Sequence, residues 1–387
     1  MSPLTKSADW KTSGSVSKWR ENEEVRTRKK ESRFICQMEI LPILEAKTSP
    51  KPNVWYVLSP EGDGPCIRVG HTCTFVAGES RRVLVIGGAN PDGSFADVFV
   101  LDLEKYEWSC PEWKGIASRY EHSAFIPECN PQRVYVFGGA QQATNLNDVQ
   151  FLDLGKGQWE TVETIGNPPS PRTCHSMASV GSKFYEFGGG LSGPDPVLDT
   201  TLHVFNAEDN SWSQPEVKGS PPCSRHGHVS VAIGTDIYVH GGMAGTDMFD
   251  DLYRFNTVNH TWSKLQPTGQ APCSRTAHAA ACIGRKIIIH GGMNSVGAAL
   301  DDVHTLDTET LTWTKAQIKG PSPAPRLDHT LCAVEIPIST GDGVSSQAEI
   351  DGSLPVLLMF GGMDTQGEIF NDCLVLMSES SNKTSIK

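Results

Sequence analysis

The sequence predicts an all-β protein in which one unit of four antiparallel strands is repeated six times. Three observations support this: the chain has 37 Gly and 25 Pro in 387 residues, its apolar runs are short, and the same residue marks return about every fifty positions. Such a turn-rich chain does not fit a helical bundle, and nine Trp and fourteen Phe are more than a disordered chain carries. Six four-stranded units at this period are typical of a β-propeller.

The clearest mark is a glycine pair that ends an apolar run in every unit. Glycine at such a point provides a positive φ or room for a neighbouring backbone. Upstream of each pair lies an Arg, with a His three residues after it. The glycine pairs are Gly87-Gly88, Gly138-Gly139, Gly188-Gly189, Gly241-Gly242, Gly291-Gly292 and Gly361-Gly362. The Arg/His marks are Arg68/His71, Arg119/His122, Arg172/His175, Arg225/His228, Arg275/His278 and Arg326/His329.

Each unit contains four strand-like segments, expected in the first unit at about 71–77, 83–88, 97–103 and 107–111. An acidic residue opens the third strand of every unit: Asp97, Asp148, Asp199, Asp251, Asp302 and Asp372. We expect the Arg of the mark to pair with this Asp or with turn carbonyls. In five units a Trp follows on the outer strand, where it can fill the wedge between neighbouring blades: Trp108, Trp159, Trp212, Trp262 and Trp313.

The sixth unit has no Trp after its third strand at 371–377. A strand-like segment that begins at Trp55 lies before Arg68, just as Trp108 lies before Arg119. We therefore expect this N-terminal strand to complete the last blade and to close the ring, so that no long sheet edge stays open.

Charge and length suggest one domain with short flanking segments. The net charge is −12, from 33 basic and 45 acidic residues, and such an acidic chain is a poor nucleic-acid binder. No apolar run has the length of a membrane span. The expected organisation is a disordered charged extension at 1–37, a linker at 38–52, the propeller at 53–377 with a flexible insertion at 339–353, and a disordered tail at 378–387.

The propeller topology predicts where a partner binds. The connections after the second strand and between blades emerge on one face, and they are the long, variable ones. The candidate residues of this loop-rich face are Asn90, Asp92, Phe95, Asn145, Asp195, Asp247, Phe249, Asn294, Asp364 and Phe370. The three Phe are either partner anchors or side chains tucked between blades, and the sequence leaves both readings open.

No catalytic, cofactor-binding or metal-binding residues are predicted. Of twelve His, six belong to the repeat marks, and His240 and His290 directly precede glycine pairs, so we expect a structural role for them. Catalysis would need residues that break the repeat and converge on one point, and no such cluster is apparent. The string Gly188–Gly193 fits a dinucleotide-binding pattern, but Pro194 and Pro196 rule out the helix that should follow.

These marks resemble the kelch repeat over residues 53–377. Several stretches also resemble the kelch-motif effectors of a late-endosomal Rab GTPase: R-V-G-H from Arg68, I-G-G-A-N-P from Ile86, R-Y-E-H-S-A-F-I-P from Arg119, R-H-G-H from Arg225, R-L-D-H from Arg326 and F-G-G-M-D-T-Q-G-E-I from Phe360. The resemblance implies a non-enzymatic protein that binds the Rab in its GTP form. It also implies a role in carrying mannose-6-phosphate receptors from late endosomes to the trans-Golgi network.

The expected protein is a cytoplasmic monomer that reaches endosome and trans-Golgi membranes peripherally, through its partners, and uses no cofactor. Two other functions stay open: a metal-dependent oxidase or lyase on a kelch propeller, and another protein-interaction scaffold. A ubiquitin-ligase adaptor would need a helical BTB domain before the propeller, for which 52 residues are too few.

Overall fold

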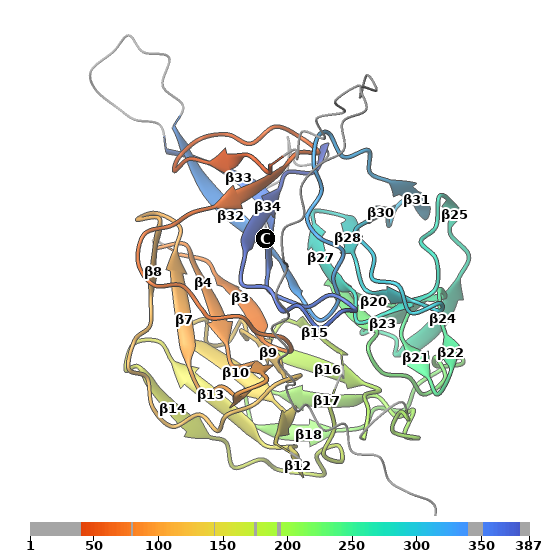
Figure 1. Ribbon diagram of the computed structural model, residues 1–387. Helices are drawn as coiled ribbons and strands as arrows, with labels where there is room; N and C mark the ends of the chain where they lie inside the picture. Colours follow the sequence, from red (N-terminus) through yellow and green to blue (C-terminus); the bar gives the residue numbers. More distant parts are fainter. Residues whose placement is uncertain are drawn as a thin grey trace, which may run out of the picture. The chain divides into compact units, whose positions relative to one another are not determined.

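The computed structural model describes residues 40–339 and 351–379, except 79, 143, 174–175 and 192–194. In the compact unit Glu39–Lys387, six antiparallel sheets are arranged in a ring (Figure 1). This confirms the predicted six-bladed all-β propeller. No helix among the described residues is long and apolar enough to cross a membrane.

The blades follow one another along the chain, each with its first strand nearest the axis (Figure 1). Blade 1 is β3 (Thr72–Val76), β4 (Arg82–Ile86), β7 (Val98–Asp102) and β8 (Glu107–Ser109). Blade 2 is β9 (Ser123–Phe125), β10 (Arg133–Phe137), β13 (Val149–Asp153) and β14 (Gln158–Thr161). Blade 3 is β15 (Ser176–Val180), β16 (Lys183–Phe187), β17 (His203–Asn206) and β18 (Ser211–Ser213).

The later blades keep this order. Blade 4 is β19 (Val229–Ile233), β20 (Asp236–His240), β23 (Leu252–Asn256) and β24 (Thr261–Leu265). Blade 5 is β27 (Ala279–Ile283), β28 (Lys286–His290), β30 (Val303–Asp307) and β31 (Thr312–Lys315), with β25 (Thr268–Gly269) parallel to β31. Blade 6 contains β32 (Thr330–Ser339), β33 (Asp351–Phe360) and β34 (Cys373–Leu376).

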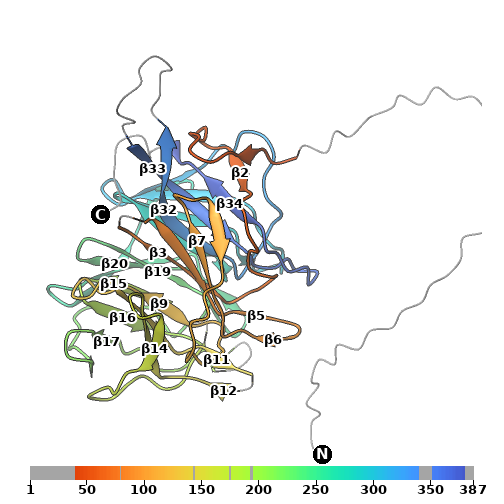
Figure 2. The ribbon, with the colours of Figure 1, turned by 90° about the vertical axis from the view of Figure 1, so that its left-hand side faces the viewer.

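Short strand pairs shape the loops after the second strands. They are β5 (Ala89–Asn90) with β6 (Gly93–Ser94), β11 (Ala140–Gln141) with β12 (Thr144–Asn145), and β21 (Met243–Ala244) with β22 (Asp247–Met248). In blade 5, β29 (Met293–Asn294) of this loop pairs instead with β26 (Arg275–Thr276), which precedes the first strand. Figure 2 shows β5–β6 and β11–β12 projecting on the same side of the ring. These loops therefore share the face on which a partner site is predicted.

The ring is closed by the N-terminal strand, as predicted. Strand β2 (Trp55–Leu58) lies antiparallel to β34, with Trp55 opposite Leu376. A further strand, β1 (Ile43–Leu44), pairs in parallel with β2 inside the range 38–52, where the sequence analysis expects a linker. Because Leu44 is 5% exposed and packs in the core, this part of the range belongs to the sheet.

The other flanking predictions fall largely outside the described residues. This holds for the extension at 1–37 and for the tail from 380 onward. Of the insertion expected at 339–353, residues 340–350 are also outside them, while Ser339 ends β32 and Asp351 begins β33.

The outer-strand tryptophans fill the wedges between blades. Trp108 of blade 1 lies 5.9 Å between ring centroids from Phe360 of blade 6, and Trp212 of blade 3 lies 5.0 Å from Phe137 of blade 2. The six wedge tryptophans are between 0 and 7% exposed: Trp55, Trp108, Trp159, Trp212, Trp262 and Trp313. Each indole joins its own sheet to the preceding one, so blade stacking supplies the core.

Candidate binding site at the centre of the loop-rich face

A buried arginine ties together three segments of each blade. Arg275 is 0% exposed, and its Nη1 donates to Asp302 Oδ1 at 2.7 Å and to the Gly291 carbonyl at 3.0 Å. The other five blades repeat this pairing: Arg68 with Asp97, Arg119 with Asp148, Arg172 with Asp199, Arg225 with Asp251 and Arg326 with Asp372. Since every blade uses its Arg and Asp in this way, these residues hold the fold.

The glycine pairs join each blade to the next. The Gly292 amide donates to the Arg326 carbonyl at 2.8 Å, and Gly362 closes the circle by donating to Arg68 at 3.1 Å. Gly292 has a φ of 90°, and a Cβ there would lie 2.6 Å from the Thr276 carbonyl oxygen. At Gly291, whose φ is 64°, a Cβ would lie 2.6 Å from the Arg326 carbonyl oxygen of the next blade. A side chain at Gly292 would therefore clash within blade 5 and one at Gly291 would clash with blade 6, which is why both residues are glycine.

The repeated histidines also bridge neighbouring blades. His329 Nε2 lies 2.9 Å from His290 Nδ1, and His278 Nε2 lies 3.1 Å from His240 Nδ1. Burial lowers the pKa of both His240 and His290 to about 3, so the rings are neutral. Among the described residues, no group of three or more His, Cys, Asp or Glu is placed to hold a metal ion. His175 lies outside these residues.

Several predicted face residues shape the loops themselves. Asn90 Oδ1 accepts the Asp92 amide at 2.8 Å, Asp364 Oδ1 accepts the Gln366 amide at 2.8 Å, and Asn294 likewise accepts amides of its own loop. The Asn145 side chain donates to the Leu191 carbonyl in the next blade. These four hold loop backbones, whereas three carboxylates are exposed: Asp92, Asp195 and Asp247.

The three predicted phenylalanines are half-buried, and each lies over the buried arginine of its own blade. The guanidinium carbons are 4.4, 4.3 and 4.3 Å from the ring centroids in the pairs Arg68–Phe95, Arg225–Phe249 and Arg326–Phe370. In the loops after the second strands, the strongly exposed apolar side chains are Leu191, Leu198 and Val296, at 50, 87 and 84%. The sequence analysis missed these because single apolar residues in loops carry no periodic signal.

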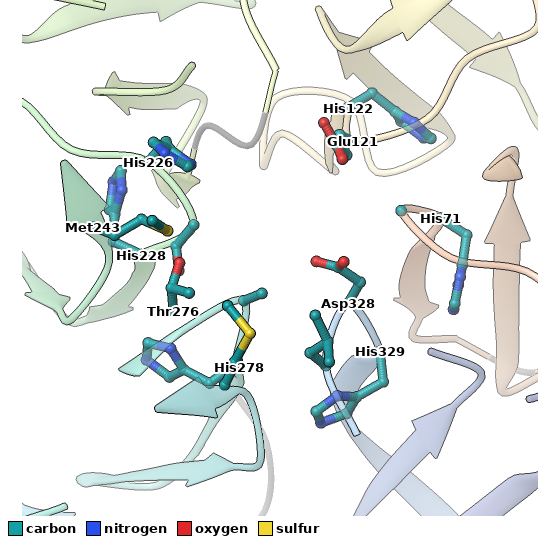
Figure 3. A pocket seen from close by; sticks show the side chains of 15 residues that line it. His71, Glu121, His122, His226, His228, Met243, Thr276, His278, Asp328 and His329 are labelled. Carbon is teal, nitrogen blue, oxygen red and sulfur yellow. The ribbon is translucent and has the colours of Figure 1, made fainter. Parts of the chain in front are cut away.

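A cavity of about 310 Å³ opens at the centre of the same face (Figure 3). Five of its lining residues directly precede the His of a repeat mark, and all five have positive φ, between 52 and 63°: Gly70, Glu121, Gly227, Ala277 and Asp328. We call these five residues the axial ring. Backbone hydrogen bonds join its members around the axis, from the Glu121 amide to Gly70 at 2.6 Å and from the Asp328 amide to Ala277 at 3.0 Å.

Two members of the axial ring break the repeat. Glu121 and Asp328 bring carboxylates into the cavity, where they face one another across it (Figure 3), while the other three members are Gly or Ala. Burial, together with the negative charge of Glu121, raises the pKa of Asp328 to about 7. The rest of the wall is mixed and includes His226, Met243 and Met293.

The axial carboxylates correct one conclusion of the sequence analysis, which found no repeat-breaking residues that converge on one point. The six residues before the marked His read Gly, Glu, Cys, Gly, Ala and Asp along the chain, at 70, 121, 174, 227, 277 and 328. Position 174 is outside the described residues. Comparing this one position across the units would have revealed both carboxylates.

Comparison with known proteins agrees with the repeat. The model of the KLHDC2/KLHL20/DRC7 Kelch-repeats domain matches residues 70–292 and 175–343. "Rab9 effector protein with kelch motifs" of Mus musculus is 48% identical over 369 residues, covering 87% of this chain and 97% of that protein. Its Homo sapiens namesake is 50% identical over 220 residues, 56% of this chain and 59% of that protein. Host cell factor 2 of Homo sapiens is 30% identical over 218 residues, 48% of this chain and 27% of that protein.

Proposed function

The chain belongs to the kelch-repeat family, and we propose that it is a Rab effector that binds a Rab GTPase through the loop-rich face of its propeller. The observation that carries the proposal is the 48% identity to a Rab9 effector protein with kelch motifs over 97% of that protein's length. Identity of this extent includes many positions besides the repeat marks.

The structure supports this face by separating two sets of residues. The Arg, Asp, Gly, His and Trp of the repeat are engaged in holding the blades together, as the Arg275 and Gly292 contacts illustrate. Exposed carboxylates, exposed apolar side chains and the central cavity lie instead with the loops. Partner contacts in repeat proteins commonly come from such variable elements on a rigid scaffold.

The proposal has a finer form. The protein binds the Rab in its GTP form, uses no catalysis, and supports the transport of mannose-6-phosphate receptors from late endosomes to the trans-Golgi network. It acts as a monomer in the cytoplasm and reaches endosome and trans-Golgi membranes peripherally, through its partners. Asp92, Asp195 and Asp247 contribute to the contact surface.

The test is a binding assay on the full chain with a panel of Rab GTPases, including Rab9, each loaded with a non-hydrolysable GTP analogue or with GDP. We expect Rab9 to be retained in the GTP-analogue state and weakly or not at all in the GDP state. No preference for any GTP-loaded Rab contradicts the proposal. Metal analysis of the same sample checks the enzymatic alternative, which stoichiometric copper or iron would favour.

A further inference from the structure

We propose that the axial cavity receives a Lys or Arg side chain of the protein partner, with its cationic group between Glu121 and Asp328. This inference rests on the proposed function for the identity of the partner. It assigns that partner a basic contact surface, and it gives the centre of the loop-rich face a specific occupant.

The first argument is the geometry of the two carboxylates. Glu121 comes from blade 2 and Asp328 from blade 6, and their side chains face into the cavity of about 310 Å³ from different sides (Figure 3). The backbone hydrogen bonds of the axial ring fix both residues on the scaffold. A long side chain entering along the axis would place its head group between two carboxylates that are already in position.

The second argument is that the cavity lacks a counter-charge of its own. Among the described residues that line it, none is Lys or Arg. Two carboxylates that face each other in a partly desolvated site repel, and burial together with the charge of Glu121 opposes the ionisation of Asp328. A cation from a partner would relieve this repulsion. The two carboxylates therefore stabilise the complex, although they destabilise the unbound protein.

The third argument is the charge of the surrounding rim. The loops after the second strands, at 89–97, 140–148, 190–199, 243–251, 293–302 and 363–372, contain no Lys and no Arg. They do contain acidic residues beyond those that pair with the buried arginines: Asp92, Asp195, Asp247, Asp250, Asp301, Asp364 and Glu368. A basic partner surface is therefore attracted to this face, and a Lys or Arg at its centre is directed toward the axis.

The wall also fits the apolar stem of such a side chain. Met243 and Met293 lie in the cavity wall together with Thr276 and Leu327. Methionine side chains adapt to methylene groups, and Lys and Arg commonly bury their stems while the charged head binds elsewhere. A divalent metal ion fits less well, because no group of three ligating side chains is present among the described residues.

The experiment compares the wild type with E121Q/D328N by titration calorimetry. The two binding partners are Rab9 loaded with a GTP analogue and the blocked peptide acetyl-Arg-Arg-Arg-amide, each at low and at high salt. The matched control is E208Q/E309Q, which removes two exposed carboxylates from the turns at Ala207–Asn210 and Thr308–Leu311, distant from the loop-rich face. Thermal melting of all three proteins checks that they are folded.

We expect E121Q/D328N to weaken Rab9 binding by about tenfold or more and to abolish peptide binding, while E208Q/E309Q binds both like the wild type. Equal binding of Rab9 by E121Q/D328N and the wild type overturns the inference and leaves the proposed function standing. If Rab9 does not bind the wild type, the calorimetry is repeated with whichever Rab the panel selects. If no GTP-loaded Rab binds, the proposed function fails, and the peptide result alone tests the cation site. Loss of peptide binding in E121Q/D328N then supports the cation site, and unchanged or absent peptide binding overturns it.

Discussion

The propeller contains two concentric sets of repeated positions, and they behave differently. In the outer set, every described blade buries the same Arg and pairs it with the same Asp, as Arg275 does with Asp302 at 2.7 Å. Each residue of the axial ring lies only two positions after one of these arginines. The residue type there is not constant: it is Gly, Glu, Ala or Asp, depending on the blade. The positions that are the same in every blade hold the blades together. The axial position differs between blades, so it can carry side chains that serve binding.

The two sets also differ in whether their charges stabilise or destabilise the fold. The arginine of each outer pair is buried, is neutralised by its Asp and donates further hydrogen bonds to carbonyls, which stabilises the fold. The axial carboxylates face each other, and no Lys or Arg is present in the described wall. Their mutual repulsion destabilises the fold. Two variants, Arg275→Ala and Asp328→Asn, separate these contributions, and a third variant tests the rim of the same face.

The largest effect is expected for Arg275→Ala. It leaves Asp302 and the Gly291 carbonyl without their buried donor, and we expect a loss of about 3 to 5 kcal/mol in the free energy of unfolding. Urea denaturation measures it. The control is Arg285→Ala, which removes an exposed pair with Glu309 and should cost no more than about 1 kcal/mol. Similar losses in both variants would show that the buried arginines do not hold the blades.

A smaller effect of opposite sign is expected for Asp328→Asn. The folded-state pKa of Asp328 is raised from 3.8 to about 7, so this residue lowers stability progressively as the pH rises from about 4 to about 7. Asn does not ionise, so the variant does not lose stability in this way as the pH rises. Relative to the wild type, it should therefore gain about 2 kcal/mol between pH 4 and pH 8, a value reduced for the partial exposure of the side chain.

Urea denaturation of both proteins across this pH range measures the gain. Glu208→Gln, in an exposed turn of blade 3, serves as the control and should show no such trend. A difference between Asp328→Asn and the wild type that stays constant with pH would mean that the axial carboxylate is well solvated or already paired.

The smallest effect on stability is expected for the double charge reversal D92K/D247K. Both carboxylates are exposed in loops, so the free energy of unfolding should stay within about 0.5 kcal/mol of the wild type. Binding of GTP-loaded Rab9 should weaken clearly, because the rim loses its charge complementarity. Undiminished binding would move the contact to another face of the propeller.

The outer frame was predictable from sequence because its signals occur once in every blade. Arg275, Gly292 and Trp313 each have five equivalents, and six aligned instances reveal both the fold and the structural role of the residue. The closing strand was predictable for the same reason, because the Trp missing from the last blade has its counterpart at Trp55. Repetition made these predictions secure.

The axial site was not predicted because its signal is a departure from the repeat. Glu121 and Asp328 are 207 residues apart in sequence, and only the ring brings both to one cavity. Glu186 could not be predicted for the same reason. Its Oε1 lies 3.3 Å from Arg172 Nη1, and both side chains are fully buried. The equivalent position in the other blades is apolar, as at Val85 in blade 1. Single polar residues inside an apolar strand give no pattern from which a buried ion pair could be derived.

The closing strand has a consequence for how the chain reaches its native state. Trp55 pairs with Leu376, so closing the ring joins two strands that lie at opposite ends of the propeller sequence. The chain entropy of joining such distant segments opposes closure until the intervening blades have stacked and shortened the gap. We therefore expect blades 1 to 5 to assemble first, as an open arc with two exposed edges, and the closure of blade 6 to be a late step of folding. Before closure, the unpaired edges of such an arc would favour aggregation.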